Sequence, residues 1–457
     1  MSRRRGEDGQ TVLRKGLLTV VGLIVCLLPA YGQEETGRDE FGAMMGQRRA
    51  ATGFFRAMRG ENRWWLVDPN GYLFLSAGVN GVSLAASSGE EEADGGYREA
   101  ALEKHRSEAA WAEATAGRLR QWGFNTLGPD SDGAVRDQEM AFTVSLDCSR
   151  AVRQADAGLF PDVFDPDFER GVRRHVSRAC RLYAEDRRLV GYFTDGRLDW
   201  GTGDEGTGPL MARFLSMEDA APGRRAVLDF LERRYLTIAE LNEVWVTSYE
   251  SFEEIGRTPQ VGSRIPQGDI DGFQQLVARE YFRITHEAIR ESDRHHLILG
   301  PRFEGEAPGP VLAAMGDLIS AVSVEWSAGR PSAGQLRRMQ RLADKPVLIC
   351  DLAIAVSPAA GGGRRQVRAC AETEEEQASQ LGARVREFLA LPMVIGYQWQ
   401  SYVDETAGRG RGRCGLVGRD DEPHEGLVAA AEETNAALYE LAAVRRKGQA
   451  GREAADE

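Results

Sequence analysis

The sequence L-V-G-Y-F-T-D-G-R-L-D-W, residues 189–200, decides the fold. Its first half is an apolar run that predicts a buried strand, and its second half is a polar turn with Asp195, Arg197 and Asp199. Parallel α/β folds place their chemistry where a buried strand opens into such a turn. We therefore expect a functional site at the end of this strand.

Seven other runs repeat this pattern and alternate with helix-like segments. Eight strands separated by crossover segments are typical of a (β/α)8 TIM barrel, and the fold class is therefore α/β. A doubly wound open sheet is the alternative, but no G-x-G-x-x-G motif follows the first strand. The other seven predicted strands cover residues 75–80, 123–128, 142–146, 297–302, 319–326, 346–350 and 394–399.

Two additions to the barrel are expected. Two strand-like runs flank the turn D-P-N-G at residues 68–71, which predicts a small N-terminal β-hairpin. A mostly helical stretch between the fourth and fifth strands, including residues 224–245 and 273–293, predicts a long insertion after the fourth strand. The barrel is expected over residues 53–447, after a linker at 33–52 and before a disordered tail at 448–457.

The first 32 residues have the pattern of a secretory signal peptide. Basic residues at the start precede the apolar run Leu17–Leu28, and Ala30 and Gly32 supply the small residues that a signal peptidase reads. We expect cleavage near Gly32-Gln33 and a secreted or periplasmic protein with no membrane span after cleavage. An uncleaved anchor is the alternative, but the apolar run is shorter than the ~20 residues that span a bilayer.

Composition and cysteine spacing exclude several classes of function. The net charge of −13 argues against a nucleic-acid partner, because binding phosphates needs a basic face. The oligomeric state is not predicted. The mechanism considered below requires no cofactor and no metal, and His295 and His296 are expected in the loop before the fifth strand. After signal cleavage an odd number of cysteines remains, without C-x-x-C spacing, so we expect small buried side chains: Cys148, Cys180, Cys350, Cys370 and Cys414.

Carboxylates, amides and tryptophans gather at the predicted carboxyl ends of the strands. Carboxyl groups can protonate a leaving group or attack a sugar carbon, and aromatic faces stack on sugar rings. Each residue alone is more often structural, but their co-location at eight strand ends predicts a site. The candidates are Asn80, Asn125, Asp195, Asp199, Trp200, Arg302, Glu325, Trp326, Asp351, Gln398, Trp399, Tyr402 and Asp404.

Seven motifs strengthen this interpretation by their order and spacing. They are W-W-L-V-D-P-N-G-Y-L-F-L-S-A-G-V-N (64–80), G-F-N-T-L-G (123–128), D-V-F-D-P-D-F (162–168), G-Y-F-T-D-G-R-L-D-W (191–200), L-G-P-R-F (299–303), K-P-V-L-I-C-D (345–351) and I-G-Y-Q-W-Q-S-Y-V-D-E (395–405). With these motifs the chain resembles the β-agarase family of retaining TIM-barrel glycoside hydrolases, which is related to β-galactosidase-type barrels. The resemblance covers residues 63–428.

The resemblance implies a catalytic pair, which this chain has altered. In the family a D-N-E motif after the fourth strand supplies the acid/base glutamate, and an S-E-F motif after the seventh supplies the nucleophile. The acid/base position falls on Arg197 and the nucleophile position on Asp351, while Gly196 replaces the asparagine that contacts the sugar. The remaining candidates, from Asn80 to Asp404, are then expected to bind a poly- or oligosaccharide.

These replacements differ in their chemical consequences. Retaining hydrolysis needs two carboxyl groups about 5–5.5 Å apart. Asp351 keeps a carboxylate, shorter by about one methylene, whereas a guanidinium cannot act as a general acid. Arg197 is instead expected to pair with Asp351. Substitute acids are sought at Asp195 and Asp199, with Asp204, Glu205 and Glu325 as further candidates.

Two functions follow from this interpretation. The first is a secreted glycoside hydrolase that acts on a galactan-like polysaccharide with Asp351 and a relocated acid. The second is a catalytically inactive homologue, a pseudoenzyme that binds carbohydrate or a protein partner. The lost motif residues favour the second for the chemistry, and a scaffold without any ligand is a third alternative.

Overall fold

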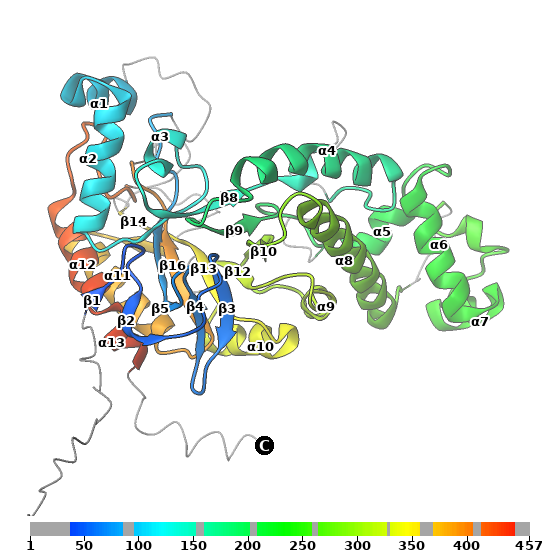
Figure 1. Cartoon of the computed structure of the whole chain (residues 1–457). Coiled ribbons are helices and arrows are strands. Elements are labelled where there is room, and N and C mark those ends of the chain that lie inside the picture. Colours follow the sequence, from blue (N-terminus) through cyan, green and yellow to red (C-terminus); the bar gives the residue numbers. More distant parts are fainter. Residues whose placement is uncertain are drawn as a thin grey trace, which may run out of the picture. The chain divides into compact units, whose positions relative to one another are not determined.

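A computed structural model describes residues 37–85, 96–151, 160–201, 208–257, 264–326, 330–356, 369–404 and 413–443. The predicted signal peptide and the predicted C-terminal tail lie outside these residues. Residues 36–457 form one compact unit (Figure 1). In the part that is described, no helix is both long and apolar enough to cross a membrane.

The predicted barrel is confirmed. Nine parallel strands pair in the order β10-β9-β8-β7-β6-β16-β13-β12-β11. The two ends of this order, β10 and β11, are consecutive pieces of one strand separated by Pro301, so the chain itself closes the sheet. The strands are β6 (Ser76–Val79), β7 (Thr126–Leu127), β8 (Ala141–Ser145), β9 (Leu189–Phe193), β10 (Leu297–Gly300), β11 (Arg302–Glu304), β12 (Val322–Trp326), β13 (Val347–Leu352) and β16 (Val394–Trp399).

Helices connect these strands on the outside of the sheet (Figure 1). A small parallel pair, β14 (Ile354–Val356) with β15 (Ala369–Ala371), follows β13. The helices are α1 (Tyr97–His105), α2 (Glu108–Gln121), α3 (Gly133–Arg136), α4 (Pro166–Tyr183), α5 (Leu210–Leu215), α6 (Pro222–Tyr235), α7 (Ile238–Trp245), α8 (Gln267–Arg290), α9 (Gly309–Ala314), α10 (Ala333–Ala343), α11 (Glu374–Leu389), α12 (Glu425–Ala436) and α13 (Leu438–Ala443).

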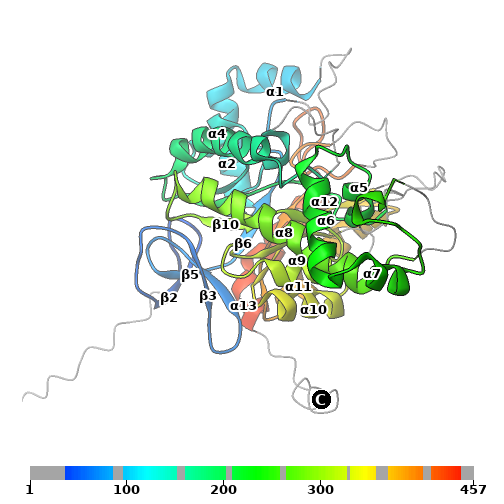
Figure 2. The same cartoon turned by 90° about the vertical axis from the view of Figure 1, so that its right-hand side faces the viewer.

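The insertion after the fourth strand is also confirmed. It contributes α5, α6 and α7, which lie beyond α8 on the side away from the strands (Figures 1 and 2). The predicted helical stretch 224–245 is two helices, because Leu236 has a positive φ of 58° and Thr237 caps the next helix. The side chain of Thr237 accepts a hydrogen bond from the backbone of Glu240, which satisfies a free donor at that helix start.

The N-terminal hairpin belongs to a larger antiparallel sheet. Its order is β1-β2-β5-β4-β3, in which β4 (Trp64–Val67) and β5 (Tyr72–Phe74) are the predicted hairpin and β3 (Arg56–Arg59) is an edge strand. β1 (Gly37–Arg38) and β2 (Met44–Arg48) lie within the expected linker 33–52, so a linker is wrong for these residues. Both strands are largely exposed to water, so they lack the alternation of buried and exposed residues that identifies a strand in a sequence.

The antiparallel sheet packs against the inside of the barrel at its amino end. One hydrophobic cluster joins Phe55, Leu66 and Phe74 of this sheet to residues on five barrel strands, among them Val190 and Leu348. The second, larger cluster lies between the strands and the surrounding helices. The amino end of the barrel is therefore filled with apolar side chains, and a ligand site inside it is left for the carboxyl end.

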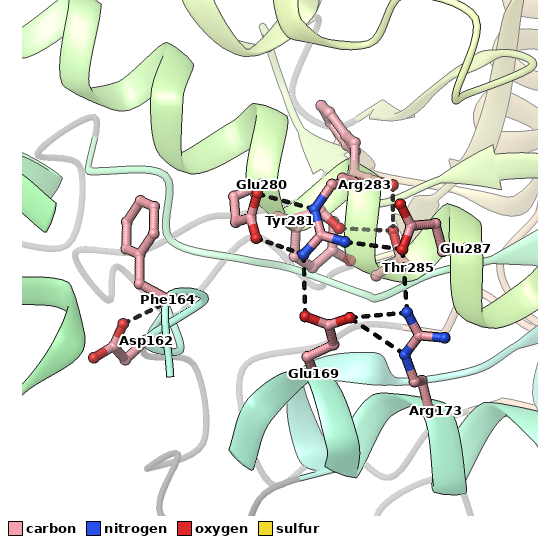
Figure 3. A network of polar contacts seen from close by, with 10 residues as sticks. Asp162, Phe164, Glu169, Arg173, Glu280, Tyr281, Arg283, Thr285 and Glu287 are labelled. Carbon is pink, nitrogen blue, oxygen red and sulfur yellow. Dashed lines mark hydrogen bonds and ion pairs between the residues drawn. The ribbon is translucent and has the colours of Figure 1, made fainter. Parts of the chain in front are cut away.

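An ion-pair network joins α4, which precedes β9 in the chain, to α8, which precedes β10 (Figure 3). Arg283 donates to Glu169 at 3.1 Å and to Glu287 at 2.8 Å, and Arg173 donates to Glu169 at 2.8 Å. Hydrogen bonds from Arg173 and Arg283 lower the pKa of the Glu169 carboxyl group. The network holds α8 in place, and α8 carries Tyr281, which contacts the turn after β9.

Glu169→Gln should lower the free energy of unfolding by about 1 kcal/mol at neutral pH, because two guanidinium groups lose their anionic partner. A carboxyl group with a lowered folded-state pKa stabilises the fold above its unfolded pKa, and this contribution is lost as the pH falls through the folded value. The difference between wild type and variant in urea unfolding should therefore shrink as the solution is acidified below the ordinary value of 4.5.

Asp229→Asn is the control for this measurement, since Asp229 forms an exposed i,i+4 pair with Arg225. Its effect should be near zero at every pH. An equal loss in both variants would show that the α4–α8 network has no special role.

Candidate active site

Three carboxylates lie in one row at the carboxyl end of the barrel. Glu304 is the register partner of Glu325 on the neighbouring strand, and Glu325 is the register partner of Asp351 on the next. Neighbouring parallel strands are about 4.8 Å apart, so the backbones that carry these side chains are adjacent. Glu325 and Asp351 are both buried, so the row brings negative charge into a region of low dielectric.

Arg197 binds this row from the turn after β9. Its Nε donates to Glu325 Oε2 at 2.7 Å and lies 3.8 Å from Glu304 Oε2. Burial acts to lower the pKa of Arg197, but the charges of Glu325, Glu304 and Asp351 act to raise it, and the net pKa is above its ordinary value. Arg197 is therefore a permanent cation here.

The expected ion pair between Arg197 and Asp351 is not the one that forms. Among the described residues, the carboxylates within ion-pair distance of Arg197 are Glu325 and Glu304. The charge of Asp351 still acts on the Arg197 guanidinium, which places both in one electrostatic unit. β11 continues from β10, which pairs with β9, and the next strand after β11 is β12 rather than β13. The turn after β9 that carries Arg197 is therefore closer to Glu325 on β12 than to Asp351 on β13.

A second cation, Arg302, lies beside the altered motif. Its guanidinium carbon is 5.8 Å from the centre of the Phe193 ring, and a Cβ added at Gly196 would be 3.3 Å from its Nη2. Gly196 thus leaves room for this guanidinium because it has no side chain. Burial acts to lower the pKa of Arg302, while the nearby carboxylates Glu325, Asp130 and Asp351 act to raise it, and the net pKa is above its ordinary value.

Asn80 and Gln398 place amide groups inside the barrel. Asn80 Nδ2 donates to the carbonyl of Cys350 at 2.9 Å, and Gln398 Nε2 donates to Thr143 Oγ1 at 3.2 Å. Both side chains depend on glycines, since a Cβ at Gly128 would be 1.8 Å from Asn80 Oδ1 and one at Gly78 would be 2.8 Å from Gln398 Cγ.

Three buried polar atoms in this region have no hydrogen-bond partner within the described residues. They are the acceptors Asn80 Oδ1 and Gln398 Oε1 and the donor Arg302 Nε. A buried polar atom without a partner costs roughly 1–3 kcal/mol, so such atoms indicate a place for a polar ligand or water. We call the set Asn80, Arg302, Glu325, Asp351 and Gln398 the barrel mouth.

Asp195, one proposed substitute acid, is a structural carboxyl group. It accepts hydrogen bonds from Ser149 N at 2.9 Å, Ser149 Oγ at 2.6 Å and Tyr281 Oη at 2.5 Å. Burial raises the pKa of Asp195 to about 6, against the opposing effect of these hydrogen bonds. Its oxygens are occupied by protein donors, which leaves it poorly placed to protonate a ligand.

Asp199, the other proposed substitute, is also occupied. Its Oδ1 accepts from Gly201 N at 2.8 Å, and its Oδ2 is 3.0 Å from Arg213 Nη1. The candidates Asp204 and Glu205 lie outside the described residues. Glu325 is therefore the carboxylate that the described structure places beside Asp351.

The four aromatic residues expected to contact sugar are buried in the apolar core. Trp200 packs among Phe160, Tyr281 and Phe303, and Trp326 packs on Phe388. Trp399 Nε1 donates to the carbonyl of Cys414, and Tyr402 Oη is 3.4 Å from both Arg118 Nη1 and Thr115 Oγ1. In this geometry they support the strand ends and offer no open ring face to a sugar.

Two polar candidates are likewise bound by the protein. Asn125 precedes β7, accepts from Ala77 N at 2.8 Å and donates to the carbonyl of Leu75 at 2.9 Å, so it ties two strands together. Asp404 accepts from Gly415 N and contacts His424 Nε2 at 2.8 Å, and this hydrogen bond raises the pKa of His424.

Other side chains of the region were not singled out from the sequence. Thr143 and Ser149 are short polar residues whose role depends on which strand faces them, so no local signal identifies them.

The cysteines Cys148, Cys180, Cys350 and Cys414 are buried, as expected. The described residues contain no group of three or more His, Cys, Asp or Glu side chains arranged to hold a metal ion.

Comparison with known proteins agrees with this geometry. No protein-family model matches the chain. Beta-agarase A and Beta-agarase B of Vibrio sp. (strain JT0107) are each 24% identical to it, over 83% and 89% of its length. The alignments cover 45% and 50% of those proteins, so the chain spans about half the length of these relatives.

A solved structure has a similar fold. The structure of an exo-beta-agarase superposes with a TM-score of 0.77 and 21% identity, covering 89% of this chain and 68% of that one. The predicted resemblance is therefore confirmed in sequence and in fold.

Tyr281→Phe should destabilise the protein by about 1–3 kcal/mol at pH 7, because it removes a donor from the buried Asp195 carboxylate. The loss should be smaller at pH 5, where Asp195 with its pKa of about 6 is largely protonated and depends less on that donor. Urea unfolding at the two pH values measures the difference.

Tyr397→Phe is the matched control, since the Tyr397 hydroxyl donates to the neutral amide of Asn435 at 2.6 Å. Its cost should be independent of pH. A pH-independent cost in Tyr281→Phe as well would contradict the assignment of an ionised Asp195 as its partner.

Proposed function

We propose, from the premise that this chain resembles β-agarases, that it binds a galactan-type polysaccharide at the barrel mouth and does not hydrolyse it by the family's two-glutamate route. The proposal places the saccharide at the carboxyl ends of the strands, where TIM barrels bind ligands. It describes a carbohydrate-binding homologue, and the galactan class comes from the likeness to the agarases.

The observation that carries the proposal is the ion pair between Arg197 and Glu325. The position that should donate a proton holds a cation that cannot release one near neutral pH. Its Nε is bound 2.7 Å from Oε2 of Glu325, so the pair also occupies this buried carboxylate. General acid catalysis needs a group that can give up a proton near the working pH, and Arg197 does not provide it.

Binding is supported by the unpartnered polar atoms of the barrel mouth. Sugar hydroxyls both donate and accept, so they are the kind of group that Asn80 Oδ1, Gln398 Oε1 and Arg302 Nε would each pair with. Filling buried, unpaired positions contributes more to affinity and specificity than adding contacts at an exposed surface. Sugar hydroxyls are uncharged. They therefore also suit a mouth in which Glu325 is already paired with Arg197.

The N-terminal signal pattern completes this proposal. A polysaccharide too large to enter a cell is met outside it, so a secreted or periplasmic location agrees with the ligand. The mature protein would begin near Gln33.

A second candidate function is hydrolysis with Asp351 as nucleophile and Glu325 as a relocated acid. One observation favours it: the two residues are register partners on neighbouring strands, so their carboxyl groups can approach the spacing used by retaining enzymes, about 5–5.5 Å. Glu325 would have to leave Arg197 before it could act as an acid.

Gln398→Leu should weaken binding of neutral agarose oligosaccharides by about tenfold, because it removes both an acceptor and its support of the mouth. Isothermal titration calorimetry on the full chain measures the affinity. Gln380→Leu on α11, outside the barrel, is the matched control and should bind as wild type does. Equal affinity in both variants, with unchanged thermal unfolding, would move the binding site away from the mouth.

Wild type should release no reducing ends from agarose, porphyran, β-galactans or aryl β-glycosides. Turnover that vanishes in both Asp351→Ala and Glu325→Gln would establish the second candidate function and overturn the first. If no saturable binding to any of these glycans is found, the mouth has no carbohydrate ligand and the scaffold alternative stands.

A further inference from the structure

A cavity of about 330 Å³ lies at the amino end of the barrel, opposite the barrel mouth. Its walls are the turn between β3 and β4, one face of α10 and the residues that precede β16. Trp64 N donates to the carbonyl of Pro392 at 2.7 Å, which fixes the turn to the start of β16. The volume lies within the range of small-ligand sites, roughly 300–1,000 Å³.

The cavity is strongly basic although the chain as a whole is acidic. Four arginines and one acid, Glu61, line it, whereas the net charge of the chain is −13. Arg63 is not available to a ligand, because it donates to the carbonyls of Leu389, Val394 and Ala442. The remaining cations are Arg59, Arg337 and Arg341.

Two of these cations have no ion-pair partner within the described part of the chain. Arg337 and Arg341 are one helical turn apart on α10, so they lie on the same face, and neither forms an ion pair with another described residue. Like charges in this spacing destabilise a helix by about 0.2–0.5 kcal/mol. Arg338, between them in sequence, does have a partner in Glu306. Among the three arginines of α10, the two without an ion pair to a described residue are thus the two on the face that lines the cavity.

The other lining groups suit a sugar. Trp64 is half-buried, with the Arg59 guanidinium 5.7 Å from its ring centre, and Gln340 adds an amide. Arg59 is held only by an exposed pair with Asp344 at 3.2 Å, which solvent screens. Planar guanidinium groups bind sulfate-like and carboxylate oxygens in pairs, and an indole offers an apolar surface to a pyranose ring.

We propose that this cavity binds the sulfate or carboxylate group of an acidic polysaccharide, as an accessory site separate from the barrel mouth. The six residues of β16 make five steps of roughly 3.3 Å each, which separate its two ends by about 17 Å. The inference deepens the proposed function, and rests on it in taking a polysaccharide as the ligand. It adds that the polymer, or a neighbouring stretch of it, is anionic.

The test compares the full chain with three variants on the same helix. Arg337→Gln and Arg341→Gln each remove one cavity charge, and Arg338→Gln removes the same charge from the paired position outside the cavity. The probes are sulfated galactan oligosaccharides, oligogalacturonate, neutral agarose oligosaccharides of equal length and inorganic sulfate. Affinities are measured by calorimetry at low and high salt, and thermal unfolding checks each fold.

Arg337→Gln and Arg341→Gln should each weaken binding of the sulfated galactan or the oligogalacturonate by about tenfold at low salt, with a smaller effect at high salt. Neutral oligosaccharides should bind all three variants as they bind wild type, and Arg338→Gln should match wild type throughout. Whichever of the two acidic probes shows the loss identifies the anionic group.

Equal affinity of Arg337→Gln and Arg338→Gln for both acidic probes would overturn the inference, and so would inorganic sulfate binding as tightly as the oligosaccharides. The result also separates the two proposals. If neutral oligosaccharides fail to bind but the acidic ones bind in an arginine-dependent way, the mouth proposal fails and the accessory site stands. If neutral sugars bind through Gln398 and acidic ones are insensitive to Arg337 and Arg341, the reverse holds.

Discussion

Closure of the parallel sheet through residues 297–304 is the constraint on which the site depends. The chain passes from β10, which pairs with β9, directly to β11, which pairs with β12. This single strand therefore brings the turn after β9 within reach of Glu325 at the end of β12. In an open sheet these two strands would be at opposite edges, and Arg197 would have no carboxylate to bind.

The charge arrangement of the mouth follows from that closure. Three carboxylates in register would repel one another, and burial would raise their pKa values if nothing compensated them. Arg197 and Arg302 supply two positive charges to the same region, and the charges of Glu325 and Asp351 act to raise the pKa of both guanidinium groups. A glutamate at position 197 would place a fourth acid there. The arginine at this position instead supplies a stabilising counter-charge.

The two ends of the barrel differ in the kind of ligand that their side chains can bind. At the carboxyl end the guanidinium groups face buried acids, and the unpaired atoms of Asn80 and Gln398 are neutral acceptors. At the amino end Arg337 and Arg341 form no ion pair with another described residue, although Glu61 lines the same cavity. A polymer with both neutral and anionic sugars could contact the two ends with different parts of its length, as multivalent binding requires.

The sequence by itself determined the eight strands, their order, the hairpin, the insertion and the positions of Arg197 and Asp351, because apolar periodicity and motif spacing are local properties. It did not determine partners. Only the tertiary structure decided three features of the site. They are the pairing of Arg197 with Glu325, the hydrogen bonds of Asn125 beside β6, and the burial of Trp200, Trp326, Trp399 and Tyr402. A strand end can point to the mouth or to the helix layer, and a local pattern does not distinguish the two. That choice is made by sheet register and closure, which join residues more than a hundred positions apart.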